Sequence, residues 1–219
     1  MQLYACHLTL QEPLFFATRE VGRLYETGRY LHNYALTYAL GLVHAPYFNG
    51  VQVPRYADEL QPLNRQQCYV TPAKPLEVSF QLATMKYGEE VTRTEMLPGR
   101  LNTPSFGRLK ELAPESTFRF YVLSAAPLKL PHWIRLGKWH SKTLVEVTEL
   151  EVKERAGDYT AACPLNPLDV PAGVLRAFDI ISMPPASLVA NARCHGAHYA
   201  LEGGLGLPVG MKYNVMRDA

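Results

Sequence analysis

The sequence lacks several features that mark specialised classes of protein. Its 219 residues include only four cysteines, at positions 6, 68, 163 and 194, and no two are close together. A disulfide framework is therefore not expected. The N-terminus has no basic segment with a cleavage motif, and the longest apolar run, Tyr30 to Val43, falls short of the ~20 residues that span a bilayer. We expect a cytoplasmic protein with no membrane contact.

Charge is also scarce. Charged residues make up 19% of the chain, and 22 Lys and Arg against 20 Asp and Glu leave a net charge of only +2. The average charge therefore does not indicate a nucleic-acid-binding protein. The hydrophobic share of 47% excludes a disordered chain, and the length predicts one domain over residues 1–219. Tyrosine and proline are abundant, with 13 and 17 residues, and prolines shorten helices and lengthen loops.

The periodicity of apolar residues predicts an α+β fold. Alternating patterns predict strands over residues 2–10, 76–87, 117–123 and 143–152, with further strands at 178–181 and 211–215. Helical spacing predicts a helix over 29–42, whose tyrosines 30, 34 and 38 we place in the core, and short helical pieces near 105–113 and 186–192. Loops are expected over residues 14–28, 44–75 and 88–115. We expect an antiparallel or mixed sheet with helices on one face.

The charge is unevenly distributed along the chain. The segment from Ser116 to Val145 contains no acid, but it contains five cations and both tryptophans. Cations bind phosphates and aromatic faces stack on bases, so the segment is a candidate RNA-binding region. A loop with buried tryptophans and solvated lysines explains the same pattern equally well. The candidate RNA-binding residues are Arg135, Lys138, Trp139, His140 and Lys142.

Two further segments are candidate phosphate sites. Arg19, Arg23 and Arg29 lie in a glycine-containing turn ahead of the predicted helix, where backbone amides favour anions, although surface ion pairs with nearby acids explain them too. The second segment, residues 202–210, is rich in glycine and includes Gly204 and Gly206. Its spacing fits neither a Walker A loop nor a dinucleotide fingerprint. It indicates either a close backbone approach to a phosphate or a tight turn.

The sequence gives little support for catalysis, a metal or a cofactor. Cys194, His195 and His198 lie close together, but the remaining cysteines and histidines are distant, so no metal site is expected. No Gly-x-Ser-x-Gly nucleophile elbow is present. His32, His132 or His140 could act as a general base, but no partner for any of them is evident. We expect no catalytic residue and no cofactor.

Three features together resemble a known superfamily. An N-terminal strand, a tyrosine-rich first helix and a glycine-rich loop near the C-terminus are similar to the RAMP proteins of CRISPR systems. The segments Gly28-Arg-Tyr-Leu-His-Asn-Tyr-Ala-Leu-Thr-Tyr-Ala-Leu-Gly-Leu42 and Trp133-Ile-Arg-Leu-Gly-Lys-Trp139 resemble the type I-D Cascade subunit of the Cas-five group (Csc-one). The resemblance spans the whole chain. The glycine loop of this chain is shorter than in many RAMP proteins.

The resemblance implies a ferredoxin-like (RRM-like) RAMP domain with a β-hairpin thumb insertion and long irregular loops. It also implies a non-catalytic subunit that caps the 5′ handle of the crRNA, near the PAM duplex, between the large subunit and the helical-backbone subunits of Cascade. The target double-stranded DNA would then meet a further set of cations. These candidates, in the 88–115 region, are Arg93, Arg100, Arg108 and Lys110.

Two alternatives remain open at this point. One is a metal-independent endoribonuclease that processes CRISPR repeat RNA, with His32 or His140 as the base. The other is a protein-interaction module that makes no contact with nucleic acid.

Overall fold

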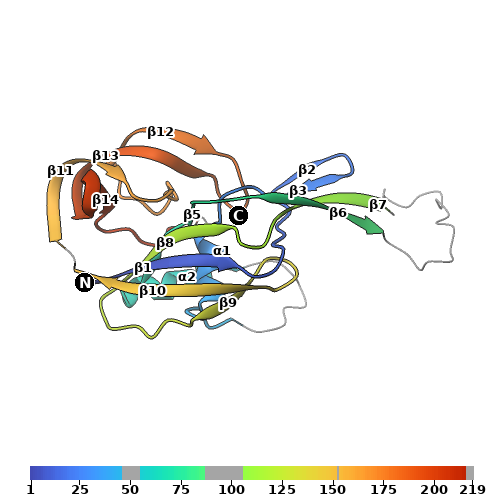
Figure 1. Cartoon of the computed structure of the whole chain (residues 1–219). Helices are drawn as coiled ribbons and strands as arrows, with labels where there is room; N and C mark the ends of the chain where they lie inside the picture. The colour runs from blue at the N-terminus through green and yellow to red at the C-terminus, as the bar shows by residue number, and fades with distance from the viewer. Residues whose placement is uncertain (46–54, 87–105, 152, 216–219) are drawn as a thin grey trace.

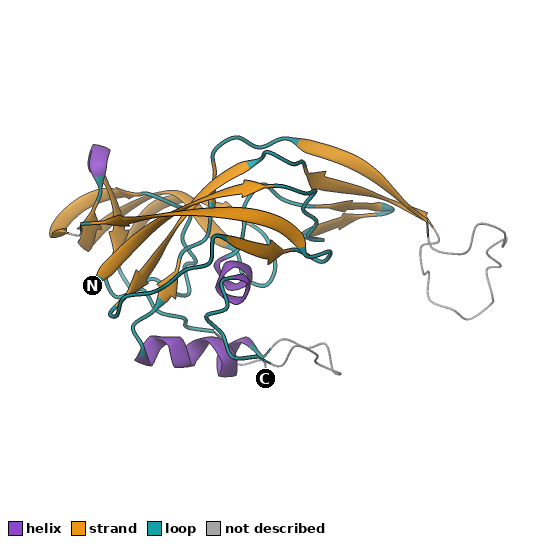
Figure 2. Ribbon diagram, turned by 60° about the horizontal axis from the view of Figure 1, so that its bottom comes forward, coloured by secondary structure: helices purple, strands orange, loops and turns teal. Residues whose placement is uncertain are grey.

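The computed structural model describes residues 1–45, 55–86, 106–151 and 153–215, in which strands form three sheets (Figures 1 and 2). The main sheet has the strand order β4-β8-β1-β10-β9, and β5 also pairs with β8. The strands of this sheet are β1 (Gln2–Leu10), β4 (Tyr69–Val70), β5 (Lys74–Pro75), β8 (Thr117–Ser124), β9 (Trp133–Leu136) and β10 (Ser141–Leu150). The predicted strands at 2–10, 117–123 and 143–152 are confirmed as β1, β8 and β10.

One face of the main sheet is covered by helices. The alternating residues Tyr4, Cys6, Leu8 and Leu10 of β1 are buried with apolar side chains of β8 and β10, as the period of two predicts. Leu36 and Leu40, at the helix α1 (Asn33–Ala39) and its C-terminal cap, pack in the same cluster. Helix α2 (Tyr56–Arg65) lies on the same side of the sheet (Figure 2).

Helix α1 is shorter than the predicted helix over 29–42. It begins after His32, whose Nδ1 accepts a hydrogen bond from the Tyr34 amide and so caps the helix. It ends before Gly41, which has a φ of +72°. Tyr34 is buried as predicted, but Tyr30 lies outside the helix and is only half-buried.

The second sheet packs over part of the opposite face of the main sheet. Leu3, Tyr121 and Leu123 of the main sheet share an apolar cluster with Tyr159, Leu165 and Leu207. The order of the second sheet is β11-β14-β13-β12, and η1 precedes β14. Its elements are β11 (Lys153–Ala161), β12 (Leu175–Ile181), β13 (Leu188–Ala200), η1 (Glu202–Gly204) and β14 (Leu205–Pro208).

Two predictions in this region are wrong. The helical piece near 186–192 belongs to β13, because its residues pair with β12 in a long antiparallel ladder. Residues 211–215 are not a strand. That segment is held by hydrogen bonds instead: the Lys212 amide donates to the Asp169 carbonyl, and the Asn214 amide donates to the Asp169 carboxylate.

The third sheet extends away from the other two (Figure 1) and has the order β2-β3-β7-β6. Its strands are β2 (Arg19–Val21), β3 (Leu24–Glu26), β6 (Phe80–Lys86) and β7 (Phe106–Leu112). The predicted loop over 14–28 is therefore a hairpin in part, with Gly22 at its turn at a φ of +58°. The short helix predicted near 105–113 is wrong, because these residues form β7 between β3 and β6.

The two predicted irregular regions are corrected in part. Residues 55–75 of the 44–75 region form α2, β4 and β5, where Leu60 and Leu63 of the helix are buried against the core despite Pro62 within it. In the 88–115 region, residues 106–112 form β7. Residues 46–54 and 88–105 of these regions lie outside the described residues.

The fold is mostly β, with helices on one side of the main sheet. Neighbouring strands of the main sheet, over the residues that the structure describes, all pair antiparallel. In a split βαβ unit a third strand separates the two parallel strands, and β1 and β4 fit this pattern because both pair antiparallel with β8 between them. The described residues between β8 and β10 form no helix, so the second helix of a ferredoxin-like domain is missing there and that arrangement is not confirmed. Among the helices that the structure describes, none has the length and apolar character needed to cross a membrane.

Candidate nucleic-acid interface

Part of the main sheet remains open beside the second sheet, on the face opposite the helices. Strand register defines this surface, because residues directly opposite each other share a face. Thr9 pairs with both Leu144 and Thr117, and Leu144 pairs with Trp133. One pleat repeat further along, His7 pairs with Arg119 and Glu146, and Arg119 also pairs with Lys74. We call this surface the open face. Its members are His7, Thr9, Lys74, Thr117, Arg119, Trp133, Arg135, Lys142, Leu144 and Glu146. Glu146 is an acid on this surface, and its Oε2 lies 3.6 Å from His7 Nδ1.

Trp133 is the main aromatic group of the open face, with 52% of its surface exposed. The Arg135 guanidinium carbon lies 5.7 Å from the centroid of the ring, and Lys142 Nζ lies 6.0 Å from it. The two cations face each other across β9 and β10, because Arg135 pairs with Lys142 in the register. A flat ring with two positive charges close by suits a nucleic-acid strand, whose base stacks on the ring while its phosphates meet the cations.

Arg135 and the Lys142 backbone share an acidic partner at the edge of the sheet. Glu12 Oε2 lies 3.2 Å from Arg135 Nη1 and accepts a hydrogen bond from the Lys142 amide at 2.7 Å. Both side chains of the Arg135–Glu12 pair are about half exposed. An ion pair in that setting contributes little, so a phosphate can replace Glu12 as the partner of Arg135 at low cost.

The turn between β9 and β10 holds three of the residues predicted from the sequence. Gly137 has a φ of +74°, and the Lys138 amide donates to the Phe15 carbonyl at 2.9 Å. Trp139 stacks on Phe15 with a ring-centroid distance of 5.0 Å. Trp139 therefore packs partly against the protein, whereas Lys138 and His140 are exposed. The five predicted residues of this region do come together on one hairpin.

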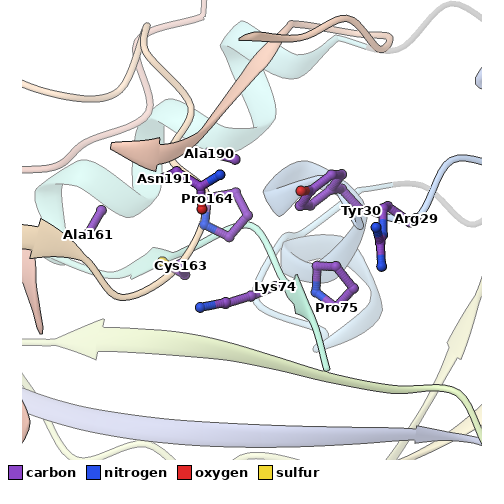
Figure 3. Close-up of a pocket in the computed structure, with 9 residues that line it drawn as sticks. All are labelled: Arg29, Tyr30, Lys74, Pro75, Ala161, Cys163, Pro164, Ala190 and Asn191. Atoms are coloured by element: carbon purple, nitrogen blue, oxygen red, sulfur yellow. The ribbon is translucent and has the colours of Figure 1, made fainter. Parts of the chain in front are cut away.

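Arg29, the third predicted arginine, lines a pocket of about 180 Å³ where the second sheet meets β5 (Figure 3). The pocket also takes in Tyr30, Lys74, Pro75, Pro164 and Asn191. No carboxylate is among the residues that line it, so its charge comes from Arg29 and Lys74. Lys74 lies directly opposite Arg119, which connects the pocket to the open face.

Arg19 and Arg23 lie away from the β9–β10 hairpin, in and beside the hairpin of β2 and β3. The third sheet also holds two of the predicted DNA-binding residues. The Arg108 amide donates to the Arg23 carbonyl at 2.8 Å, and Lys110 Nζ lies 3.7 Å from Glu26 Oε1 and 4.5 Å from the centre of the Phe80 ring. Arg93 and Arg100, the other two, lie outside the described residues.

The glycine-rich segment divides into an exposed part and a buried part. Gly204 is exposed, with a φ of +74°, in the turn that leads into β14. Gly206 is buried, and a Cβ there would lie 2.8 Å from ring atoms of both Tyr159 and His198. Gly206 therefore allows those two rings, which stack with centroids 4.1 Å apart, to close over the sheet. Of the two predicted glycines, only Gly204 is exposed at the surface.

The candidates predicted from the sequence do not include Trp133, Arg119 or Lys74 of this surface. Trp133 lies in the acid-free segment from Ser116 to Val145, but only the pairing of β9 with β10 shows that its side chain is on the same face as Arg135 and Lys142. Arg119 lies in the acid-free segment from Ser116 to Val145. It stands between buried residues of β8, and the alternation of a strand then indicates that Arg119 is exposed. Lys74 has no usable signal, since it stands close to two prolines in a segment without periodicity.

The candidate histidine bases lie in different surroundings. His32 is only 5% exposed, caps α1, and its pKa is lowered to about 4 because burial disfavours the charged ring. His140 is exposed in the turn after β9, where its backbone carbonyl accepts a hydrogen bond from Arg135. Among the described residues, no three His, Cys, Asp or Glu side chains gather in a way that could hold a metal ion.

Comparison with solved structures shows a fold shared with a chain of a type III-B complex. A chain of the Type III-B Cmr-beta complex, seen by cryo-EM bound to cognate target RNA and AMPPnP, matches with 9% identity and a TM-score of 0.50, over 87% of this chain and 86% of that one. A CRISPR protein from Archaeoglobus fulgidus matches with 12% identity and a TM-score of 0.47, over 95% of this chain and 99% of that one.

Sequence comparison gives a more specific answer. No curated protein matches the sequence. The family model described as type I-D CRISPR-associated protein Cas5/Csc1 matches residues 1–215, which is nearly the whole chain. This confirms the resemblance carried by the first helix and by the segment from Trp133 to Trp139. The chain therefore belongs to the type I-D Cas5/Csc1 family of CRISPR-associated proteins.

Proposed function

We propose that the chain is a non-catalytic subunit of a type I-D CRISPR effector complex that binds the 5′ handle of the crRNA. The observation that carries this proposal is the open face, where Trp133 stands exposed beside Arg135 and Lys142. Single-stranded RNA offers unpaired bases to such a ring, whereas a duplex keeps its bases stacked within the helix. The proposal also explains the low net charge, since one defined segment of RNA needs only a local patch.

Intrinsic fluorescence tests the proposal, because the chain has only two tryptophans. Trp139→Phe keeps an aromatic ring against Phe15 and leaves Trp133 as the sole reporter. Titrating this protein with single-stranded handle RNA should quench Trp133, and a duplex of the same sequence should quench it much less. Unchanged fluorescence at saturating RNA would refute the role of the open face.

Binding measurements on substituted chains separate stacking from charge. Trp133→Ala should weaken handle binding by roughly 5- to 150-fold, as loss of a stacking platform worth ~1–3 kcal/mol predicts. Lys142→Met should lower affinity and reduce the dependence of log K on log salt by about 0.7, the value for one phosphate contact on a single strand. Lys153→Met, at an exposed position of β11, is the control and should change neither.

The proposed absence of catalysis needs a separate test. His32 is buried and occupied in capping α1, so it cannot reach a substrate without local unfolding. His140 remains the accessible candidate base for the endoribonuclease alternative. The full chain should leave CRISPR repeat RNA intact in EDTA. Cleavage that disappears in His140→Ala would overturn the non-catalytic assignment.

We further propose that the β6–β7 hairpin is the thumb insertion and meets the target DNA near the PAM. It extends away from the main sheet (Figure 1), and its described part carries Arg108, Lys110 and an exposed Leu82. Replacing both cations with Gln should weaken the binding of target duplex by the assembled complex. The crRNA content of that complex should stay the same; a parallel loss of crRNA would contradict this assignment.

A further inference from the structure

The pocket beside β5 has the chemistry of a site for a phosphorylated ligand with hydroxyl groups. Figure 3 shows Lys74 and Arg29 on opposite sides of the pocket, with Pro75 between them and Tyr30 above, its hydroxyl pointing toward Asn191. Because none of the lining residues is acidic, both cations act on an entering anion without competition from within the pocket. Its volume of about 180 Å³ suits a group of the size of one nucleotide or less.

Asn191 adds a directional hydrogen-bond acceptor. Its Nδ2 donates to Asp179 Oδ2 at 2.7 Å, and a carboxylate can only accept, so this bond fixes which end of the amide carries the oxygen. Asp179 occupies one hydrogen of the amide nitrogen, and Oδ1 is left to accept a hydrogen bond from a ligand hydroxyl. The backbone at Asn191 has a φ of +51°, a conformation that asparagine tolerates better than most residues.

We propose that this pocket binds one ribonucleotide of the RNA strand, with phosphate oxygens at Lys74 and Arg29 and a ribose 2′-hydroxyl donating to Asn191 Oδ1. The 2′-hydroxyl is the group that distinguishes RNA from DNA at a given position. Asn191 is thus the residue that makes the subunit prefer RNA. Asp179 acts as a positioning residue by holding the amide in the required orientation.

The proposal rests on the proposed function, because the strand must also cross the open face. Lys74 on β5 and Trp133 on β9 are separated by four strand spacings, through β8, β1 and β10, which is about 19 Å across the sheet. Arg119 lies on this path, directly opposite Lys74. A single strand running across the sheet therefore meets a stacking ring at one end and the pocket at the other.

Mononucleotides test the pocket independently of the open face. In the full chain carrying Trp133→Ala, calorimetry or NMR titration should detect uridine 5′-monophosphate and show a preference for it over 2′-deoxyuridine 5′-monophosphate. Asn191→Gly removes the amide and tolerates the positive φ, so it should reduce that preference about fivefold, as expected for one neutral hydrogen bond. Lys74→Met should weaken both nucleotides alike, and Lys153→Met should have no effect.

The same variants then separate the two proposals when a longer RNA is used. If handle RNA still quenches Trp133 but Asn191→Gly and Lys74→Met leave mononucleotide binding unchanged, the pocket assignment is wrong and the proposed function stands. If uridine 5′-monophosphate binds as described but Trp133 is not quenched, the open face is wrong and the pocket remains. Equal affinity for the ribose and deoxyribose forms in the unsubstituted pocket would also overturn the role of Asn191.

Discussion

The buried carboxyl of Asp169 should make the stability of the fold depend on pH. Its Oδ2 accepts hydrogen bonds from Asn33 Nδ2 and from the Tyr69 hydroxyl, both at 2.9 Å, and its Oδ1 accepts one from the Asn214 amide at 3.0 Å. The residue is 2% exposed. Burial raises its pKa from 3.8 to about 6, although these hydrogen bonds act in the opposite direction.

The sign of the effect follows from this raised pKa. The folded state binds the proton of Asp169 more tightly than the unfolded state does, so the group contributes stability below about pH 4 that is lost as the pH rises through about 6. At 1.36 kcal/mol for each pKa unit, the change from 3.8 to about 6 corresponds to about 3 kcal/mol in the free energy of unfolding.

Asp169→Asn removes this dependence, because an amide does not titrate. The carboxylate accepts hydrogen bonds from three donors, and the NH2 group of the new amide would face at least one of them. That hydrogen bond is lost, which costs about 1–3 kcal/mol at every pH. The informative quantity is therefore the difference between the two proteins as a function of pH. Between about pH 4 and pH 8, that difference should shift by about 3 kcal/mol in favour of the variant.

Urea unfolding followed by circular dichroism measures both curves. Asp58→Asn, in an exposed position of α2, is the control and should follow the unsubstituted protein across the range. If the curves of Asp169→Asn and the unsubstituted protein run parallel, the carboxyl has the same proton affinity in the folded and unfolded states. Burial would then not raise the pKa of Asp169, and the reasoning would be refuted.

Three further predictions concern packing. Gly137→Ala should lower the melting temperature and RNA affinity together, since its Cβ would lie 2.6 Å from Leu14 Cδ1 and 2.7 Å from the Phe15 carbonyl oxygen; a change in affinity alone would contradict this. Gly206→Ala should cost roughly 1–3 kcal/mol in urea unfolding by crowding the Tyr159 ring, and an unchanged midpoint would refute it. All four cysteines are buried, so a thiol reagent should react fully only after denaturation; rapid labelling of the native protein would disagree.

The sequence predicted best those strands whose pattern reports burial on one side. In β1, alternation places Cys6 and Leu8 in the core, and the structure confirms this. Prediction from the sequence failed where strand pairing or packing overrides the local pattern. Apolar residues near 105–113 have helical spacing, yet Leu109 and Leu112 are buried from a strand that is fixed by β3 and β6 on either side. Helix α2 was missed because prolines concealed its short apolar face.

The candidate site shows the same division. The run of cations around both tryptophans is a property of the chain, and it located the β9–β10 hairpin without a structure. The direction of each side chain cannot be read from the chain alone, since Trp133 lies on the open face while Trp139 stacks on Phe15. Gly206 likewise lies in a segment with the composition of a phosphate-binding loop, but its lack of a side chain allows the rings of Tyr159 and His198 to pack there.

The sequence by itself determined the family, the core strands and the position of the basic, tryptophan-containing segment, because these depend on residue order and local periodicity. The tertiary structure alone decided which cations share a surface. Lys74, Arg119 and Trp133 are far apart in the chain and come to share one face only through strand register. Arg29 and Asn191 meet only because the second sheet stacks beside β5. Pairing between distant strands is a long-range interaction, and no local pattern in the chain encodes it.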